Sequence, residues 1–183
     1  MVLVSCVLDL QIAIKNAKDG DTITIANNTY STNDLITVSC NNVSIVAETD
    51  GHVFFKGGSL SFVVTGNKNT IRGFQFIYGS SLPTRPVDLF QIRGSYNILE
   101  HMNFNGYYVQ HYVNIYGKSQ YNLIRSCNIQ GKPVDRAING SQIEIQADKN
   151  VIGYHKISHC SFQKMIGNGG DFGNEPIRLG EGS

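Results

Sequence analysis

The chain has 183 residues, a length typical of one domain, and its apolar content of 41% is sufficient for a hydrophobic core. A net charge of +1 offers no electrostatic basis for binding nucleic acid or an anionic membrane, and no apolar run reaches membrane-spanning length. No signal peptide is visible, which leaves the compartment unknown. Extracellular, periplasmic and virion-associated locations are all compatible with the sequence.

Residues 1–20 are predicted to form a strand followed by a short capping helix. The residues with the spacing of one helical face are Leu10, Ala13, Ile14 and Ala17. Asp9 is expected to cap the start of this helix, and the Asp-Gly-Asp at 19–21 is expected to end it.

An eight-residue phrase recurs along the rest of the chain, at 69–76, 97–104, 122–129 and 155–162. The steps between copies are 28, 25 and 33 residues, and every copy has apolar residues at its third and eighth positions. Periods of this size indicate stacked units that cannot bury their apolar faces alone. Gly and Asn residues between the apolar segments indicate tight turns, because both tolerate positive φ.

A second series of short segments alternates in polarity, as strands do. Its members are Leu60–Val64, Val87–Arg93, Val113–Tyr116, Ile143–Gln146 and Ile177–Leu179. We therefore predict an all-β fold over 1–183: a right-handed parallel β-helix of about five or six coils at 21–183, behind the capping helix. A β-sandwich is the competing fold, disfavoured because hairpin signals are scarce.

The C-terminus lacks a counterpart to the capping helix, since the sequence stops directly after a predicted strand. The domain is therefore expected to be truncated there, and to need a partner chain or further coils over its open end.

Cys127 and Cys160 hold equivalent positions in the third and fourth copies of the phrase, so they should stack on neighbouring coils. Strand spacing would permit a disulfide, and a ladder of buried thiols is the alternative, which we favour.

Candidate ligand-binding residues lie near the ends of the second series of strands. Arg93 directly precedes a glycine, Arg178 lies two residues before one, and Lys118 follows one. A row of such cations would suit a chain of acidic sugars, although solvated surface charge is the simpler explanation.

The densest polar stretch is 168–180, where four glycines would let the backbone approach a ligand. Asp171 and Glu175 could supply oxygen ligands to Ca²⁺, and Arg178 could bind a carboxylate bidentately. The alternative is a wide turn between coils.

Three motifs, in order along the chain, resemble polysaccharide lyase family 6, which includes alginate lyases and chondroitinase B. The first is Asp19-Gly20-Asp21-Thr22-Ile23, followed by Asn28-Thr29-Tyr30. The second is Val113-Asn114-Ile115-Tyr116-Gly117-Lys118, followed by Ile124-Arg125-Ser126-Cys127. The third is Asn168-Gly169-Gly170, followed by Glu175-Pro176-Ile177-Arg178-Leu179-Gly180.

The resemblance implies β-elimination on uronic-acid polysaccharides such as alginate or chondroitin and dermatan. A Lys would remove the proton beside the carboxylate, Ca²⁺ would neutralise the carboxylate, and an Arg would assist the leaving group. By the motif match, Asn168 would contact calcium and Arg178 would bind substrate, with Glu175 a further candidate for the metal.

This sequence departs from the family pattern in two ways. Extra residues separate the glycines from Glu175, so Asn174 competes with Asn168 for the calcium role. The family's base, its leaving-group arginine and its paired acidic ligands are expected on coils after this motif, so the chain alone is expected to be inactive. Lys149 resembles the catalytic lysine in its distance from Glu144, but it precedes the motif, and Gln142 stands where one paired acid is expected.

Two functions therefore remain open. One is a lyase-like β-helix that needs further coils or a partner chain. The other is a non-catalytic module that binds glycans or supports a cell or virion surface.

Overall fold

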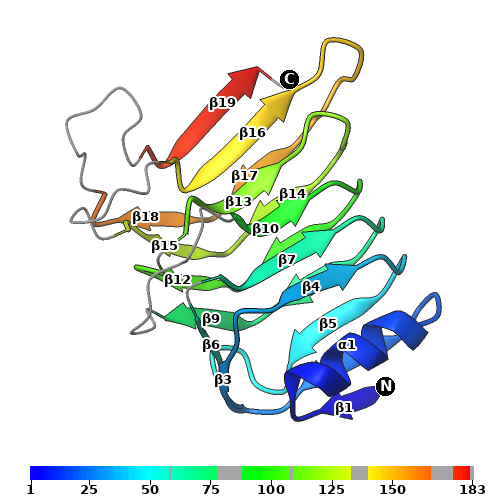
Figure 1. Cartoon of the computed structure of the whole chain (residues 1–183). Helices are drawn as coiled ribbons and strands as arrows, with labels where there is room; N and C mark the ends of the chain where they lie inside the picture. Colours follow the sequence, from blue (N-terminus) through cyan, green and yellow to red (C-terminus); the bar gives the residue numbers. More distant parts are fainter. Residues whose placement is uncertain (58, 78–87, 108, 133–139, 166–174, 182–183) are drawn as a thin grey trace.

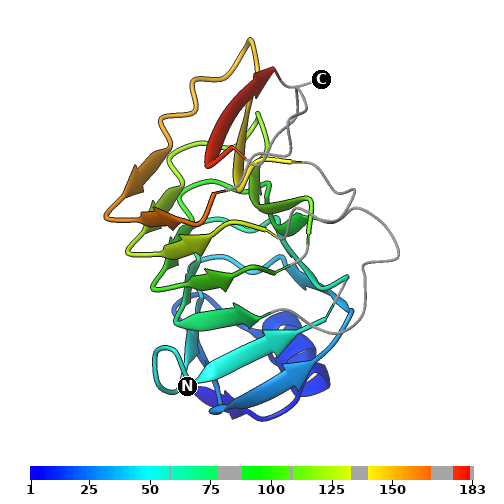
Figure 2. The ribbon, with the colours of Figure 1, turned by 90° about the vertical axis from the view of Figure 1, so that its left-hand side faces the viewer.

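The computed structural model describes residues 1–57, 59–77, 88–107, 109–132, 140–165 and 175–181. Their strands form three sheets, and each turn of the chain contributes one strand to each sheet (Figure 1, Figure 2). Every pairing between these strands is parallel. This is a parallel β-helix, so the predicted fold class is confirmed and the β-sandwich is excluded.

The first sheet has seven strands, in the spatial order β1 (Val2–Val4), β2 (Thr22–Ile25), β5 (Ser44–Ala47), β8 (Thr70–Arg72), β11 (Ile98–Glu100), β14 (Leu123–Arg125) and β17 (Lys156–Ser158). The second sheet contains β3 (Asn28–Ser31), β6 (Val53–Lys56), β9 (Phe74–Ile77), β12 (Asn103–Asn105), β15 (Asn128–Gln130) and β18 (Ser161–Gln163). The third sheet contains β4 (Leu35–Val38), β7 (Ser61–Val64), β10 (Asp88–Ile92), β13 (His111–Ile115), β16 (Ile143–Ala147) and β19 (Ile177–Glu181). The described residues thus make six coils, from β2–β4 to β17–β19.

Each repeated phrase supplies a strand of the first sheet, a sharp corner and a strand of the second sheet. The corner residue has positive φ in all four copies: Gly73, His101, Ser126 and His159. Three of the four are neither Gly nor Asn, contrary to the turn chemistry that the sequence suggested. Hydrogen bonds between coils hold these corners, since the backbone N–H of His101 donates to Arg125 O at 3.3 Å and that of Ser126 to Ser158 O at 3.1 Å. Such bonds offset the cost of the left-handed backbone, about 1–2 kcal/mol.

The core consists of columns of like side chains, one from each coil. The third position of the phrase forms an aliphatic column in which Ile71, Leu99 and Ile124 are buried. The eighth position forms a column that is aromatic except at Ile129, and Phe76 stacks on Phe104 with ring centroids 5.4 Å apart. Because identical positions meet in register, the repeat period in the sequence becomes a continuous core.

An internal ladder of asparagine side chains explains why the first position of the phrase is asparagine in three of its four copies. The side-chain oxygen of Asn97 accepts a hydrogen bond from the backbone N–H of Asn69 at 2.9 Å, and Asn122 does the same for Asn97 at 2.8 Å. Their amide groups donate to the carbonyl oxygens of Gly66 and Gly94, both at 3.0 Å. In the last copy His155 takes the place of asparagine, and its Nδ1 lies 3.2 Å from the backbone N of Asn122.

Helix α1 (Val7–Asn16) lies against the first coil beside the N-terminus (Figure 1). Its N-cap is Cys6, whose sulfur accepts a hydrogen bond from the backbone N–H of Asp9, so the prediction that Asp9 caps the helix is wrong. Leu10 and Ile14 are buried, as the helical pattern predicted. The described residues include no helix with the length and apolarity that crossing a membrane requires.

Candidate functional site

Polar side chains form a row across the third sheet, on four successive coils. The register pairs Gln91 with Asn114, Asn114 with Glu144, and Glu144 with Arg178. Alternation along a strand explains the row, because the neighbouring positions on each strand point into the core. The row therefore makes the face of the third sheet that points away from the core polar.

Glu144 is the centre of this row. Its Oε2 accepts a hydrogen bond from Ser141 Oγ at 3.0 Å and lies 3.9 Å from Nε of Arg178. Its other carboxylate oxygen approaches Gly180 so closely that a Cβ there would lie 2.4 Å from it. The glycine that follows Arg178-Leu179 therefore gives the Glu144 carboxylate its space.

A second buried polar group lies beside the row. Nδ1 of His111 is 2.7 Å from one oxygen of Asp88, and the side-chain amide of Asn114 donates to the other at 3.0 Å. Nε2 of His111 lies 4.0 Å from Oε2 of Glu144. These side chains therefore link β10, β13 and β16 through one polar cluster.

Lys132 is buried at the edge of this cluster, and sequence reasoning missed it. Its Nζ contacts the carbonyl oxygens of Gln110 and Gly140. Burial lowers the pKa of this lysine to about 7, an effect that Glu175 and Asp88 partly oppose. Lys132 lies between two strands without a periodic pattern, so nothing in the sequence signals its burial.

Several buried polar atoms near this cluster lack a hydrogen-bond partner among the described residues. They are both amide atoms of Gln142, Oδ1 of Asn114 and Oε2 of Glu175. The backbone oxygen of Glu175 accepts from the backbone N–H of Gln142 at 2.8 Å, which fixes the entry to β19.

A pocket of about 440 Å³ opens where strands β10, β13 and β16 end. Its lining residues are Arg93, Tyr116, Gly117, Lys118, Gln146, Ala147 and Asp148. The guanidinium of Arg93 lies over the ring of Tyr116, 4.0 Å from its centroid, and donates to Oε1 of Gln91 at 3.1 Å. Burial, followed by the charge of Asp88, raises the pKa of Tyr116, so its hydroxyl stays protonated beside the cations.

Positive charge predominates among the side chains that line this pocket. Neither Arg93 nor Lys118 forms an ion pair with a carboxylate among the described residues. The one carboxylate in the lining, Asp148, accepts a hydrogen bond from the backbone N–H of Asn150 at 2.8 Å. Two cations on adjacent coils therefore face the same space.

The predicted site residues lie in different parts of the structure. Arg93 and Lys118 meet in this pocket, whereas Arg178 lies on the sixth coil beside Glu144 and is not among the lining residues. Lys149 is exposed in the turn after β16, away from the buried Glu144. Asn168, Asp171 and Asn174 lie outside the described residues.

Among the described residues, no group of three or more His, Cys, Asp and Glu side chains could hold a metal ion. Glu175 does have a buried carboxylate oxygen without a described partner, but a single ligand does not define a site.

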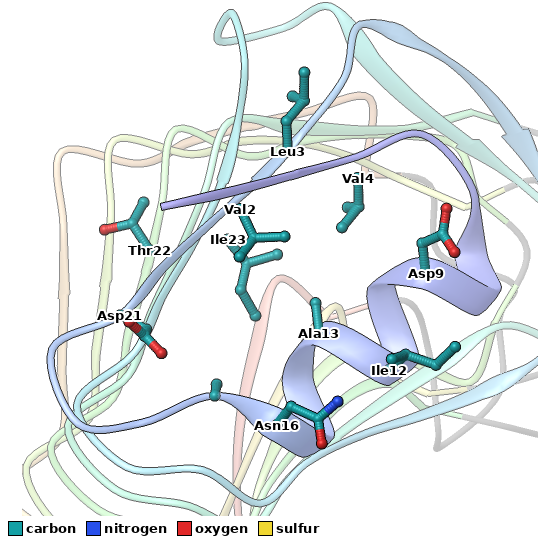
Figure 3. Close-up of a pocket in the computed structure, with 11 residues that line it drawn as sticks. Val2, Leu3, Val4, Asp9, Ile12, Ala13, Asn16, Asp21, Thr22 and Ile23 are labelled. Carbon is teal, nitrogen blue, oxygen red and sulfur yellow. The ribbon is translucent and has the colours of Figure 1, made fainter.

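A second pocket, of about 360 Å³, lies at the N-terminal end between α1 and strands β1 and β2 (Figure 3). Val2, Val4, Ile12, Ala13 and Ile23 give it a mainly apolar lining. Figure 1 shows α1 and β1 at the N-terminal end of the stack, whereas β10, β13 and β16, which carry the polar cluster, lie further along it.

The family follows from the sequence itself. Residues 4–183 match the sequence profile of the Chondroitinase B family, which is nearly the whole chain. The chain belongs to the chondroitinase B family. The predicted relationship to polysaccharide lyase family 6 is thus confirmed. No significant match is found among curated protein sequences.

Solved structures support the fold of this chondroitinase B family member. The alginate lyase AlyF-OU02 is 22% identical, with a TM-score of 0.78 over 98% of this chain and 40% of its own. A family 6 polysaccharide lyase from Pseudopedobacter saltans is 20% identical, with a TM-score of 0.78 over 98% and 41%. The family 6 alginate lyase AlyGC is 20% identical, with a TM-score of 0.77 over 98% and 26%. The chain thus spans less than half the length of these three structures.

Proposed function

We propose that this chain binds a uronic-acid polysaccharide along its third sheet and contributes to the binding cleft of a polysaccharide lyase. The observation that carries the proposal is the pocket in which Arg93 and Lys118 converge without a described carboxylate partner. Two cations on adjacent coils suit a polymer that carries carboxylates at regular intervals. Arginine binds such a group bidentately, and lysine acts as a point charge.

Tyr116 and Gln146 give the same pocket the neutral groups that a sugar needs. Gln146 can hydrogen-bond hydroxyl groups, and a protonated Tyr116 can do so without adding a negative charge. The acidic polymers on which alginate lyases and chondroitinases act carry both hydroxyl and carboxylate groups, so the lining fits them.

For catalysis we propose that the described coils are not sufficient alone. β-Elimination needs a base beside the reacting carbon and a group that cancels the carboxylate charge. Lys149 is exposed in a turn and Lys132 is held by two backbone carbonyls, so neither fits the role of the base. We infer that further coils, from a longer chain or from a partner chain, complete the active site, with calcium as the expected cofactor.

The test is a binding and turnover assay with alginate and chondroitin-type oligosaccharides, with Ca²⁺ or with chelator. The chain should bind at least one of these polymers, and Arg93→Ala with Lys118→Ala should weaken binding roughly tenfold or more. Hydrogen bonds to charged groups contribute about 1.5–3 kcal/mol each, and 1.4 kcal/mol corresponds to tenfold. Unsaturated sugar ends, followed by ultraviolet absorbance, report elimination.

Lys15→Ala is the control for the loss of a surface cation, because Lys15 is exposed on α1 and does not line the pocket. Binding without unsaturated ends is the expected result for this chain alone, and it fits both a lyase that lacks its further coils and a non-catalytic glycan-binding module. Equal affinity of the double variant and the control would contradict the proposed pocket. Turnover by this chain alone would contradict the inferred need for further coils.

A further inference from the structure

The fifth coil (β14–β16) and the sixth coil (β17–β19) each place a cysteine at the same corner of the stack. Cys127 follows β14 and Cys160 follows β17, and the register pairs Arg125 with Ser158 two residues before them. Both cysteines are free thiols. They extend an inward-facing column that contains the larger Phe74 and Met102 in earlier coils.

The two thiols have the same surroundings, displaced by one coil. The sulfur of Cys127 lies 3.2 Å from the carbonyl oxygen of Arg125 and 3.9 Å from that of Leu99. The sulfur of Cys160 lies 3.4 Å from the carbonyl oxygen of Ser158 and 3.8 Å from that of Ile124. Equivalent contacts mean that both side chains point the same way, so one sulfur stacks above the other.

We propose that Cys127 and Cys160 form an oxidation site, a reversible disulfide that staples the fifth coil to the sixth. Neighbouring parallel strands lie about 4.8 Å apart, inside the 4.4–6.8 Å range of Cα separations that disulfides require. The strand register and the matching carbonyl contacts place the two sulfurs over one another on neighbouring coils.

The chemistry assigns different roles to the two thiols. Cys160 is partly exposed, and the adjacent Cys127 thiol lowers its pKa, so it is the sulfur that reacts first. Its thiolate attacks a peroxide, breaks the O–O bond, and becomes a sulfenic acid as the alcohol or water departs. The sulfur of Cys127 then displaces the hydroxyl, and its own proton leaves with that hydroxyl as water. Overall, two thiols are oxidised to one disulfide and one peroxide is reduced.

The staple lies where the described stack is least well packed. Ile157 and Phe162 of the sixth coil are partly exposed, whereas their counterparts Ile124 and Ile129 are buried. A covalent link at this corner would hold the sixth coil, and with it β19 and Arg178, against the fifth. The proposal is independent of the proposed binding function.

The experiment uses a Cys6→Ser, Cys40→Ala background, in which only this pair can react. Treatment with hydrogen peroxide should lower the mass by two hydrogens, and peptide mapping without reductant should show Cys127 linked to Cys160. The oxidised chain should melt roughly 5 °C or more above the reduced chain, as expected for a typical disulfide, and dithiothreitol should reverse the shift.

Cys160→Ser in the same background is the matched control, and it should show neither the mass loss nor the shift. The proposal is wrong if both thiols remain titratable after peroxide oxidises a small-molecule dithiol in the same tube. It is also wrong if Cys160 accumulates as sulfinic acid, or if the product is a dimer linked between chains.

Discussion

Single residues in this protein take their properties from the coil above and the coil below. Lys132 has an ordinary surface sequence context, yet its ammonium group is buried against two backbone carbonyls. The Glu144 carboxylate of the preceding coil fills the space beside Gly180 that a side chain at this position would need. In both cases the partner is distant in sequence or comes from another coil.

Lys132 should make the stability of the protein depend on pH. Its pKa is lowered from 10.5 to about 7 in the folded chain, so between pH 7 and 9 the unfolded chain binds more protons. The free energy of unfolding should therefore rise with pH in this window, with a contribution from Lys132 of up to about 1.4 kcal/mol per pH unit. Below pH 7 the lysine is charged in both states, and its contribution should level off.

Urea denaturation at pH 7, 8 and 9 measures this effect as a difference between variants. Lys132→Met should lose the rise, whereas Lys15→Met, at an exposed site on α1, should keep it. Any other group that titrates in this range does so equally in both variants. Identical slopes for the wild type and Lys132→Met would contradict the buried, partly neutral lysine.

Among the elements, α1 differs from the strands because it has no repeat to stack upon. It packs across the first coil, and its contacts are with β1, β2 and β4. One face carries Leu10 and Ile14, which are buried, while Leu8 and Ile12 point outward. The helix therefore acts as a cap, which shields core side chains that a preceding coil would otherwise cover.

The cap should contribute to stability through its buried face alone. Leu10→Ala should lower the free energy of unfolding by about 2–5 kcal/mol, because it removes a side chain that is only 1% exposed. Leu8→Ala makes the same chemical change at a site that is 64% exposed, and it should change stability by less than about 0.5 kcal/mol. Guanidinium denaturation of both variants provides the comparison, and equal losses would show that α1 does not cap the first coil.

At the scale of the whole molecule, the two ends of the stack are not equivalent. Ile115 and Leu179 belong to the same column of side chains in the third sheet, two coils apart. Ile115 is covered and only 1% exposed, whereas Leu179 is 79% exposed. Ile177 on the same strand is also exposed. The side chains at this end are of the kind that the preceding coils bury, so we expect another polypeptide segment to cover them.

In isolation, this chain should self-associate through that end. Light scattering across a range of concentrations should give an apparent mass that rises above the 20.2 kDa monomer. Leu179→Lys should weaken the association, because a charge on an edge strand opposes pairing with another chain. A constant monomer mass at all concentrations would contradict the expectation that the sixth coil needs a partner.

The sequence alone determined the architecture, because a solenoid repeats its contacts with its period. Apolar residues at the third and eighth positions of the phrase predicted the columns to which Ile71 and Phe76 belong, and the 3.6-residue pattern predicted the buried face of α1. The family relationship was equally accessible, since it depends on local motifs in a fixed order.

Only the tertiary structure decided how the polar residues are grouped. Arg93 and Lys118 line the same pocket, whereas Arg178 lies beside Glu144. Lys149 is exposed, and Lys132 is buried. The tertiary structure also replaced Asp9 with Cys6 as the helix cap and allowed His101 at a corner with positive φ. The physical reason is that charge pairing, burial and backbone strain depend on which side chains the neighbouring coil places alongside, 21 to 34 residues away in the sequence. The repeat period gives that distance but does not show which polar side chains meet.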